Sequence, residues 1–216
     1  MKAEPRLIAV GRASEIFDLG DRRVLRRFKS GGDPEREALV MRHARDRGYP
    51  VPAVLEIAAG ALVLEKVEGP TMWEAATREP STVNAHAAML EQLHRDLHEL
   101  DAPDGLPAAG DGDRLLHLDL HPANVILSAD GPVVVDWTNA RRGEPAFDVA
   151  MTWVIGATST GRGRLGRSFL RYFLSAFDRG ELRRVLRAAA EYRLADENVT
   201  ADERRAIRAL VLAEGV

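Results

Sequence analysis

The apolar residues of this sequence change their spacing once, close to Gly69-Pro70. Before this point they form short runs separated by turn signals, which is typical of short strands. After it they mostly recur at helical intervals, which indicates amphipathic helices. The sequence therefore predicts an α+β fold in which a strand-rich segment at residues 1–67 precedes a mainly helical segment at residues 68–216, with a linker near Val67–Thr71.

The first segment is expected to form a small antiparallel sheet with one helix. Asp33 is suited to cap that helix and Pro34 to occupy its first turn, so the helix should run to about Arg47, where Gly48 ends it. The expected strands are Leu7–Val10, Ser14–Asp18, Arg23–Phe28, Val54–Ala58 and Ala61–Val67.

The second segment is expected to contain several helices and one hairpin. Residues 101–113 are rich in Asp, Pro and Gly, which predicts a loop. The hairpin should pair Val125–Leu127 with Val133–Val135. The expected helices are Thr82–Leu100, one that begins at Pro145, one around the stripe Phe169–Phe177, Glu181–Leu194 and Ala201–Leu212.

The composition excludes several classes of protein. The formal net charge is −3, which is not typical of a nucleic-acid-binding protein. No apolar run approaches the roughly 20 residues of a membrane span, and residues 1–20 hold no apolar stretch of signal-peptide length. We therefore expect a cytoplasmic protein with no membrane partner. The chain has no Cys, which excludes disulfides and thiolate metal sites, and no feature of the sequence sets the oligomeric state.

One polar cluster carries reaction chemistry. The run His117–Asn124 has the form H-x-D-x-x-x-x-N and precedes the expected hairpin, whose second strand ends at Asp136. The loop and hairpin can therefore deliver Asp119, Asn124 and Asp136 to one spot. Phosphoryl transfer needs such a set, because one carboxylate accepts the proton of the attacking hydroxyl while another carboxylate and a carboxamide oxygen hold Mg²⁺ on the phosphates.

The same region allows other interpretations. His117, Asp119 and His121 alternate, so on a strand they would share one face and could bind zinc in a metallohydrolase. Pro122 breaks such a strand, however, and no His follows position 121 to complete the ligand set. The remaining alternative is a polar turn that has no catalytic or binding role. Asp136 at the strand end argues against it.

A tetrapeptide elsewhere in the chain, His94-Arg95-Asp96-Leu97, matches the H-R-D-L sequence of a kinase catalytic loop. The fifth residue after Asp96 is Asp101 instead of Asn, and the tetrapeptide lies inside the helix expected at Thr82–Leu100. We interpret it as part of a solvated helix without a catalytic role.

The motifs resemble those of the aminoglycoside phosphotransferase-like kinases, a branch of the wider protein-kinase-like superfamily. The resemblance covers nearly the whole chain, and it rests on His117–Asn124, Val133–Trp137 and Gly143–Ala150. It implies a bilobal kinase-like fold that uses Mg²⁺ and ATP, with GTP possible as the nucleotide. The implied catalytic residues are Asp119 as the base and Asn124 and Asp136 as metal ligands, whereas Asp148 would receive hydrogen bonds from the catalytic-loop backbone.

The resemblance also implies nucleotide-binding residues in the first segment. Val24-Leu25-Arg26 resembles the strand that carries the phosphate-binding Lys of kinases, so Arg26 is expected at the phosphates, or Arg27 if the register shifts by one. Glu37, or failing that Glu35, would pair with this arginine. The other expected contacts are the loop of Gly11 to Ser14 over the phosphates and the backbone of Glu65 and Val67 at the adenine. Alternatively, the arginines belong to an ordinary basic run on the surface. Glu37 would then be a first-turn Glu that only suits the helix dipole.

The acceptor is expected to be a small hydroxyl-bearing molecule, such as a metabolite or an antibiotic. Only eleven residues lie between Asp136 and Asp148, and no A-P-E segment is present, so there is no room for the platform that holds a peptide substrate. Glu144 and Asp196 could favour a cationic acceptor or could be solvated surface acids. Two rival functions stay open: a nucleotide-binding regulator with little turnover, suggested by Arg in place of Lys, and a minimal protein kinase.

Overall fold

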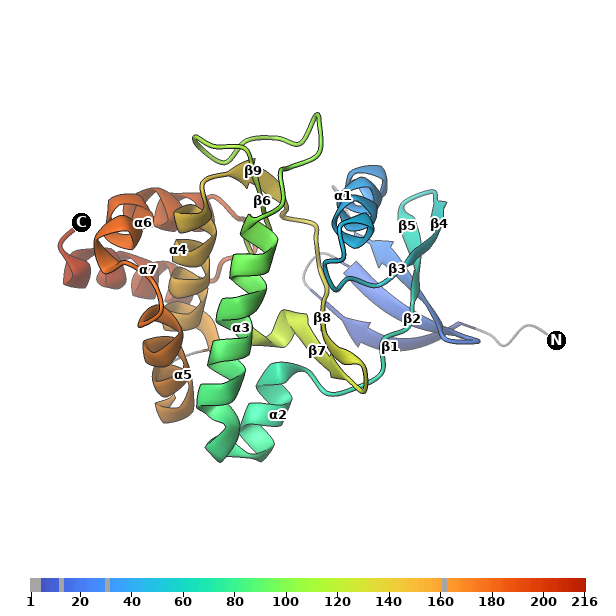
Figure 1. The fold of residues 1–216 in the computed structure, drawn as a ribbon, viewed down its shortest axis with the longest axis horizontal. Helices are drawn as coiled ribbons and strands as arrows, with labels where there is room; N and C mark the ends of the chain where they lie inside the picture. Colours follow the sequence, from blue (N-terminus) through green and yellow to red (C-terminus); the bar gives the residue numbers. More distant parts are fainter. Residues whose placement is uncertain (1–4, 12–13, 30–31, 161–162) are drawn as a thin grey trace.

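The structure is a computed structural model of the chain, and it describes residues 5–11, 14–29, 32–160 and 163–216. Figure 1 shows a sheet with one helix at one end of the molecule and a group of helices at the other. The hairpin of β7 (Val125–Ser128) and β8 (Gly131–Val134) lies between them. Within the described residues, no helix is both long enough and apolar enough to cross a membrane.

The sheet is antiparallel and its strands follow the order β1-β2-β3-β5-β4. Helix α1 (Pro34–Asp46) packs against β4 and β5. Its N-cap is Asp33, whose side chain accepts a hydrogen bond from the N–H of Arg36 at 3.0 Å. The strands are β1 (Arg6–Val10), β2 (Ser14–Gly20), β3 (Arg23–Phe28), β4 (Val54–Ala58) and β5 (Ala61–Glu65).

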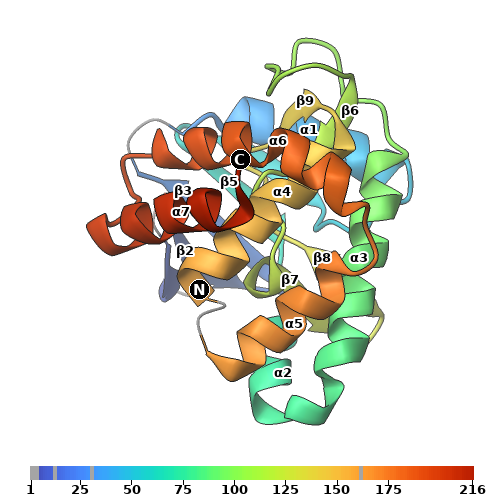
Figure 2. The ribbon, with the colours of Figure 1, turned by 90° about the vertical axis from the view of Figure 1, so that its left-hand side faces the viewer.

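The helical part is built around α4, which is buried along most of its length. Helix α4 packs against α6, and α3 packs against α5, while α6 and α7 lie side by side at the outer end of the molecule (Figures 1 and 2). The helices are α2 (Met72–Arg78), α3 (Val83–His98), α4 (Pro145–Ile155), α5 (Arg164–Leu174), α6 (Arg179–Leu194) and α7 (Ala201–Glu214). Shorter elements are β6 (Arg114–Leu116), β9 (Arg141–Gly143), the 3-10 turns at Pro80–Thr82 and Pro122–Asn124, and a π-helix at Gly156–Thr160.

The β7–β8 hairpin is attached to the linker that follows β5 and to the segment between α1 and β4. The N–H of Leu127 donates to the carbonyl oxygen of Pro70 at 2.9 Å, and the N–H of Val134 donates to that of Pro50 at 2.8 Å. Gly69 has a φ of 145°, and a Cβ there would lie 2.1 Å from the carbonyl oxygen of Leu127. Only glycine therefore lets the linker pass this close to β7.

The structure confirms the predicted α+β class and most of the predicted elements. Strands β3 and β4 have the predicted bounds, and α4 begins at Pro145 as predicted. The predicted strand Ala61–Val67 is wrong at its end, because β5 stops at Glu65. Helix α2 and the short strands β6 and β9 were not predicted.

Candidate active site

Asp148 anchors the loop that carries the H-x-D motif. It is completely buried in the first turn of α4. Its Oδ1 accepts a hydrogen bond from the N–H of Leu118 at 2.7 Å, and its Oδ2 accepts one from the N–H of His117 at 3.1 Å. These bonds hold Leu118 at a φ of 61°, a left-handed conformation that is unfavourable for leucine. The expectation that Asp148 receives hydrogen bonds from the loop backbone is confirmed.

His117 connects the loop to the end of β8. The N–H of Asp119 donates to His117 Nδ1 at 3.2 Å, so the ring proton lies on Nε2, which donates to the carbonyl oxygen of Val135 at 3.2 Å. The imidazole also packs on the Trp137 ring, with 4.6 Å between the ring centroids. Both ring nitrogens are therefore occupied by structural hydrogen bonds.

Asn124 holds the side chain of Asp119. Its Nδ2 donates to the carbonyl oxygen of Asp119 at 2.9 Å and to Asp119 Oδ2 at 3.1 Å. The other carboxylate oxygen of Asp119, Oδ1, lies 3.7 Å from His121 Nε2. Because the amide nitrogen of Asn124 is used in this way, its carbonyl oxygen is the atom that can face a metal ion.

Asp136 lies next to Asn124 across the hairpin. Val125 pairs with Val134, and the N–H of Val135 donates to the carbonyl oxygen of Asn124 at 3.0 Å. Asp136 follows at once with a φ of 68°, a left-handed conformation that Asp tolerates better than most residues. Its side chain is 40% exposed, so the turn delivers a carboxylate with free surface next to the Asn124 amide.

A buried arginine lies between the sheet and Asp136. Arg26 on β3 is 4% exposed and Glu37 on α1 is 2% exposed. Arg26 Nη1 lies 3.3 Å from Glu37 Oε1, and its Nη2 lies 2.5 Å from Asp136 Oδ1. Nη2 also donates to Thr138 Oγ1 at 2.7 Å, and that hydroxyl in turn donates to Glu37 Oε2 at 2.9 Å. We call these four residues the Arg26 cluster.

The two carboxylates of the Arg26 cluster have different electrostatics. Burial would raise the pKa of Asp136, but the charge and hydrogen bond of Arg26 outweigh it, so this pKa lies below its ordinary value. Burial raises the pKa of Glu37, and Arg26 offsets only part of that rise. Asp136 is therefore the more firmly ionised of the two.

The structure shows which of the two neighbouring arginines, Arg26 or Arg27, faces Asp136. Arg27 points to the other face of the sheet, is exposed, and donates to Glu15 Oε2 at 2.7 Å. Glu35 is exposed on α1, whereas Glu37 is buried beside Arg26. Arg26 and Glu37 are thus the pair that faces Asp136, and their expected contact with nucleotide phosphates stays a prediction.

A cleft runs between the sheet and the β7–β8 hairpin, with about 1440 Å³ of empty space, part of it open to solvent. Asp119 is not one of its lining residues. The expected loop from Gly11 to Ser14 contributes its two ends, whereas Arg12 and Ala13 lie outside the described residues. The lining includes Gly11, Ser14, Arg26, Glu37, Glu65, Val67, Asn124 and Asp136.

The tetrapeptide that begins at His94 lies inside α3, as predicted. The expectation of a solvated segment is wrong for His94, which is fully buried and whose Nε2 lies 3.0 Å from Thr152 Oγ1. Asp96 accepts a hydrogen bond from Gln92 Nε2 at 2.7 Å on the exposed side of the helix.

The zinc interpretation finds no support. Both nitrogens of His117 are used by the backbone. Among the described residues, no group of three or more His, Cys, Asp or Glu side chains is placed to hold a metal ion. The oxygen donors of Asn124 and Asp136 are instead the kind that Mg²⁺ accepts when it takes only one or two protein ligands.

The sequence matches the model of the phosphotransferase enzyme family over residues 5–116 and 106–192. No curated protein matches the chain. Among solved structures, it is similar to aminoglycoside phosphotransferase APH(4)-Ia, with 15% identity, a TM-score of 0.74 and coverage of 100% of this chain and 95% of that chain. A choline/ethanolamine kinase family protein from Mesorhizobium loti has 17% identity and a TM-score of 0.64, with coverage of 99% and 87%. APH(2")-IIa in its gentamicin complex has 15% identity and a TM-score of 0.66, with coverage of 99% and 90%.

The structural matches show a kinase-like fold, and the family match spans most of the chain. Together they confirm the resemblance carried by His117–Asn124 and Asp136. The chain belongs to the phosphotransferase enzyme family.

Proposed function

We propose that this protein transfers the γ-phosphoryl group of ATP, with Mg²⁺, to a hydroxyl of a small molecule. One observation carries the proposal: Asp119, Asn124 and Asp136 are linked by hydrogen bonds and hairpin pairing beside a cleft that also holds the buried pair of Arg26 and Glu37. This is the set of groups that phosphoryl transfer requires.

In the proposed reaction Asp119 is the base. The acceptor oxygen attacks the γ-phosphorus, the bond from that phosphorus to the bridging oxygen of the β-phosphate breaks, and the hydroxyl proton passes to Asp119. The products are a phosphate monoester and ADP. Asn124 fixes the orientation of the Asp119 carboxylate by donating to its Oδ2 at 3.1 Å, which is the kind of positioning that lowers the barrier.

Asn124 and Asp136 would hold Mg²⁺ through the carbonyl oxygen of Asn124 and the carboxylate of Asp136. Both side chains line the cleft, and both offer the hard oxygen ligands that this ion prefers. The ion would neutralise charge on the phosphates.

Arg26 is proposed to bind the phosphates. Its Nε is buried and has no hydrogen-bond partner in the described part of the chain. A buried donor without a partner is uncommon. Arg26 also lines the cleft, and a phosphate oxygen there is the type of acceptor that a guanidinium favours. Gly11 and Ser14 would lie over the phosphates, while the backbone of Glu65 and Val67 would face the base.

The proposal assigns residues 1–67 to nucleotide binding and residues 68–216 to catalysis and the acceptor. The related structures support the choice of ligands: a thermostable mutant of APH(4)-Ia forms a ternary complex with ADP and hygromycin B. The cleft residues named here would accept ATP or GTP, so both nucleotides belong in the assay.

The test compares two variants with a matched control. Asp119→Asn should lower turnover about 10²–10⁴-fold, with Mg·ATP affinity nearly unchanged. Asp136→Ala should weaken Mg·ATP binding itself, measured by calorimetry. The control is Asp96→Asn in the α3 tetrapeptide, which should leave both quantities unchanged. Full turnover by Asp119→Asn would refute the assignment.

A low-turnover regulator is the second candidate, because one contact favours it. Arg26 Nη2 lies 2.5 Å from Asp136 Oδ1 and so competes for the carboxylate proposed to bind Mg²⁺. A regulator would bind nucleotide equally well with and without Mg²⁺ and would transfer phosphate to no hydroxyl compound in a broad panel. An enzyme would bind Mg·ATP more tightly than ATP alone.

A further inference from the structure

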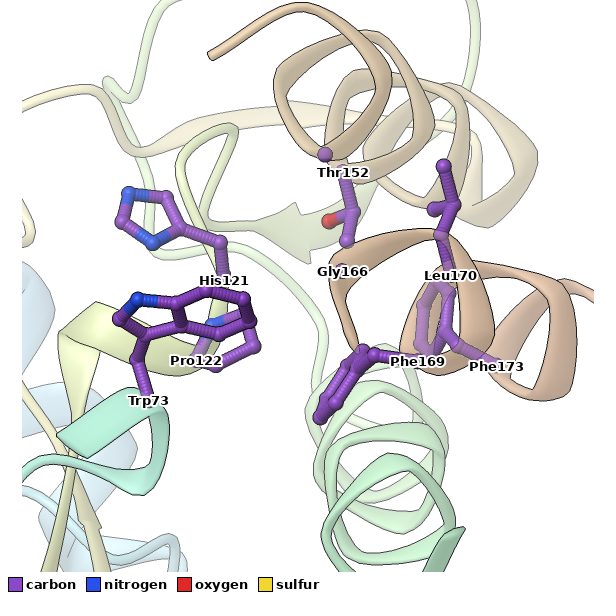
Figure 3. A pocket seen from close by; sticks show the side chains of 9 residues that line it. Trp73, His121, Pro122, Thr152, Gly166, Phe169, Leu170 and Phe173 are labelled. Atoms are coloured by element: carbon purple, nitrogen blue, oxygen red, sulfur yellow. The ribbon is translucent and has the colours of Figure 1, made fainter. Parts of the chain in front are cut away.

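A second pocket lies on the other side of the catalytic loop. Figure 3 shows Trp73, His121 and Pro122 on one side of it and the side chains of α4 and α5 on the other. Its empty volume is about 320 Å³, part of it open to solvent. We call this the aromatic pocket, and its main walls are Trp73, His121, Pro122, Phe169, Leu170 and Phe173.

The aromatic pocket is connected to Asp119 through His121. His121 lines the pocket, and its Nε2 lies 3.7 Å from Asp119 Oδ1. Asn124 occupies the other carboxylate oxygen, Oδ2. The carboxylate oxygen that is left for an acceptor proton is therefore the one nearer to His121, which lines the pocket.

The described residues that line the aromatic pocket provide no fixed charge. Among the described residues that line it, none carries a carboxylate, ammonium or guanidinium group. Phe169 and Phe173 are buried, and Trp73 from α2 is half-buried on the opposite wall. Such a lining stabilises an apolar group, whereas a cation placed there would lose hydration without gaining a counter-charge from these lining residues.

The acids that could have attracted a cationic acceptor are already paired. Glu144 Oε2 lies 2.5 Å from Arg184 Nη2. Asp196 Oδ2 lies 3.5 Å from Arg193 Nη1, and its Oδ1 accepts a hydrogen bond from the N–H of Asn198 at 2.8 Å. Neither carboxylate lines the aromatic pocket, so both belong to ion pairs of the helical part.

We propose that the acceptor is a small neutral alcohol with an apolar body, which fills the aromatic pocket and presents its hydroxyl to Asp119. This inference rests on the proposed phosphoryl transfer and specifies its substrate class. The apolar body contacts Trp73, Phe169 and Phe173, and the hydroxyl gives its proton to Asp119 as the phosphate ester forms.

The first test compares choline with its neutral isostere, in which a carbon atom replaces the nitrogen. The two alcohols have the same shape, so their difference reports charge alone. Aromatic walls by themselves could also bind a quaternary ammonium group, which makes this pair decisive. We expect the neutral alcohol to bind at least tenfold more tightly, measured by calorimetry with Mg·AMP-PNP present, and to give the higher kcat/KM. A polycationic aminoglycoside is the third arm and should bind more weakly than either.

The second test places a charge in the aromatic pocket. Trp73→Glu and Trp73→Gln remove the same indole and differ only in charge. The Glu variant should shift the preference toward choline by about tenfold relative to the Gln variant. Equal preferences in the two variants would show that the acceptor does not contact position 73 and would overturn the inference.

The two proposals fail in distinguishable ways. If Mg·ATP does not bind, the phosphotransferase proposal fails. If Mg·ATP binds and phosphate is transferred only to choline or to the aminoglycoside, the function stands and the neutral acceptor is wrong. If Mg·ATP binds but none of the three alcohols binds the wild-type protein, the aromatic pocket is no acceptor site and the inference is likewise overturned.

Discussion

A single hydroxyl group at Thr138 completes the Arg26 cluster. It accepts a hydrogen bond from Arg26 Nη2 at 2.7 Å, donates to Glu37 Oε2 at 2.9 Å and lies 3.2 Å from Asp136 Oδ1. Burying an arginine is costly unless its charge is paired and hydrogen-bonded. Thr138 therefore fixes the relative positions of the β3 cation, the α1 carboxylate and the proposed metal ligand.

Replacing this hydroxyl should mainly affect nucleotide binding. Thr138→Val keeps the shape but leaves Arg26 and Glu37 without a shared partner, which costs about 1–3 kcal/mol. We expect Mg·ATP affinity to fall about tenfold or more while kcat at saturating nucleotide changes little. Thr138→Ser restores the hydroxyl and should restore the affinity. If Val and Ser variants bind nucleotide alike, the hydroxyl has no positioning role.

At the scale of residues, spacing in the sequence predicted that Asp119, Asn124 and Asp136 lie close together, because a short loop and a hairpin leave them little freedom; their catalytic roles stay a prediction. The choice between Arg26 and Arg27 could not be made in the same way, since a shift of one residue reverses the face of a strand. In the structure, Arg26 is the one that contacts Glu37 on α1, whereas Arg27 is exposed.

At the scale of elements, α4 and the loop of His117–Asn124 are tied together by Asp148. Burial would raise the pKa of Asp148, but the hydrogen bond from His98 and the nearby histidine charges hold that pKa well below its ordinary value. The carboxylate is therefore ionised in the folded state, where it accepts from His117 and Leu118. In the unfolded chain its pKa returns to about 3.9.

Asp148→Asn should destabilise the protein and change its response to acid. The nitrogen of the new Asn side chain is a donor and would point at the N–H of His117 or of Leu118. That buried N–H would then have no acceptor, at a cost of about 3–5 kcal/mol. Because the folded-state pKa is depressed, the stabilisation from Asp148 is fully present above about pH 4 and is lost as the pH falls below that value. Urea unfolding from neutral pH to pH 3 should therefore show a smaller acid-induced decrease in unfolding free energy for the variant than for the wild type.

Some elements could not be predicted because their cause is tertiary. Strands β6 and β9 have three residues each and lie far apart in sequence; β9 directly precedes α4, which also contacts β6. Helix α2 was missed although Thr71 and Glu74 form a capping box, a signal that was present after Gly69-Pro70. The aromatic pocket was not foreseen either, since α2 and α5 supply opposite walls.

At the scale of the molecule, the sheet and the helices share one continuous core. Tyr49, which follows α1, is buried at their junction: its hydroxyl donates to the carbonyl oxygen of Leu93 on α3 at 3.0 Å, and its ring meets Trp137 edge-on at 5.7 Å. Trp137 in turn packs on His117 of the catalytic loop. Tyr49 thus joins the sheet part to the helical core and, through Trp137, to the loop of His117–Asn124.

This continuity predicts that the two parts unfold together. Thermal unfolding should show one transition, with the same midpoint by far-UV circular dichroism and by tryptophan fluorescence, because Trp137 lies at the junction. Tyr49→Phe removes only the hydroxyl and should cost about 1 kcal/mol, whereas Tyr49→Ala leaves a cavity at the junction and should cost about 3–5 kcal/mol. Both variants should keep coincident midpoints. Two separated transitions in the wild type would mean that the sheet and the helices are independent folding units, because a shared core cannot lose one side and keep the other.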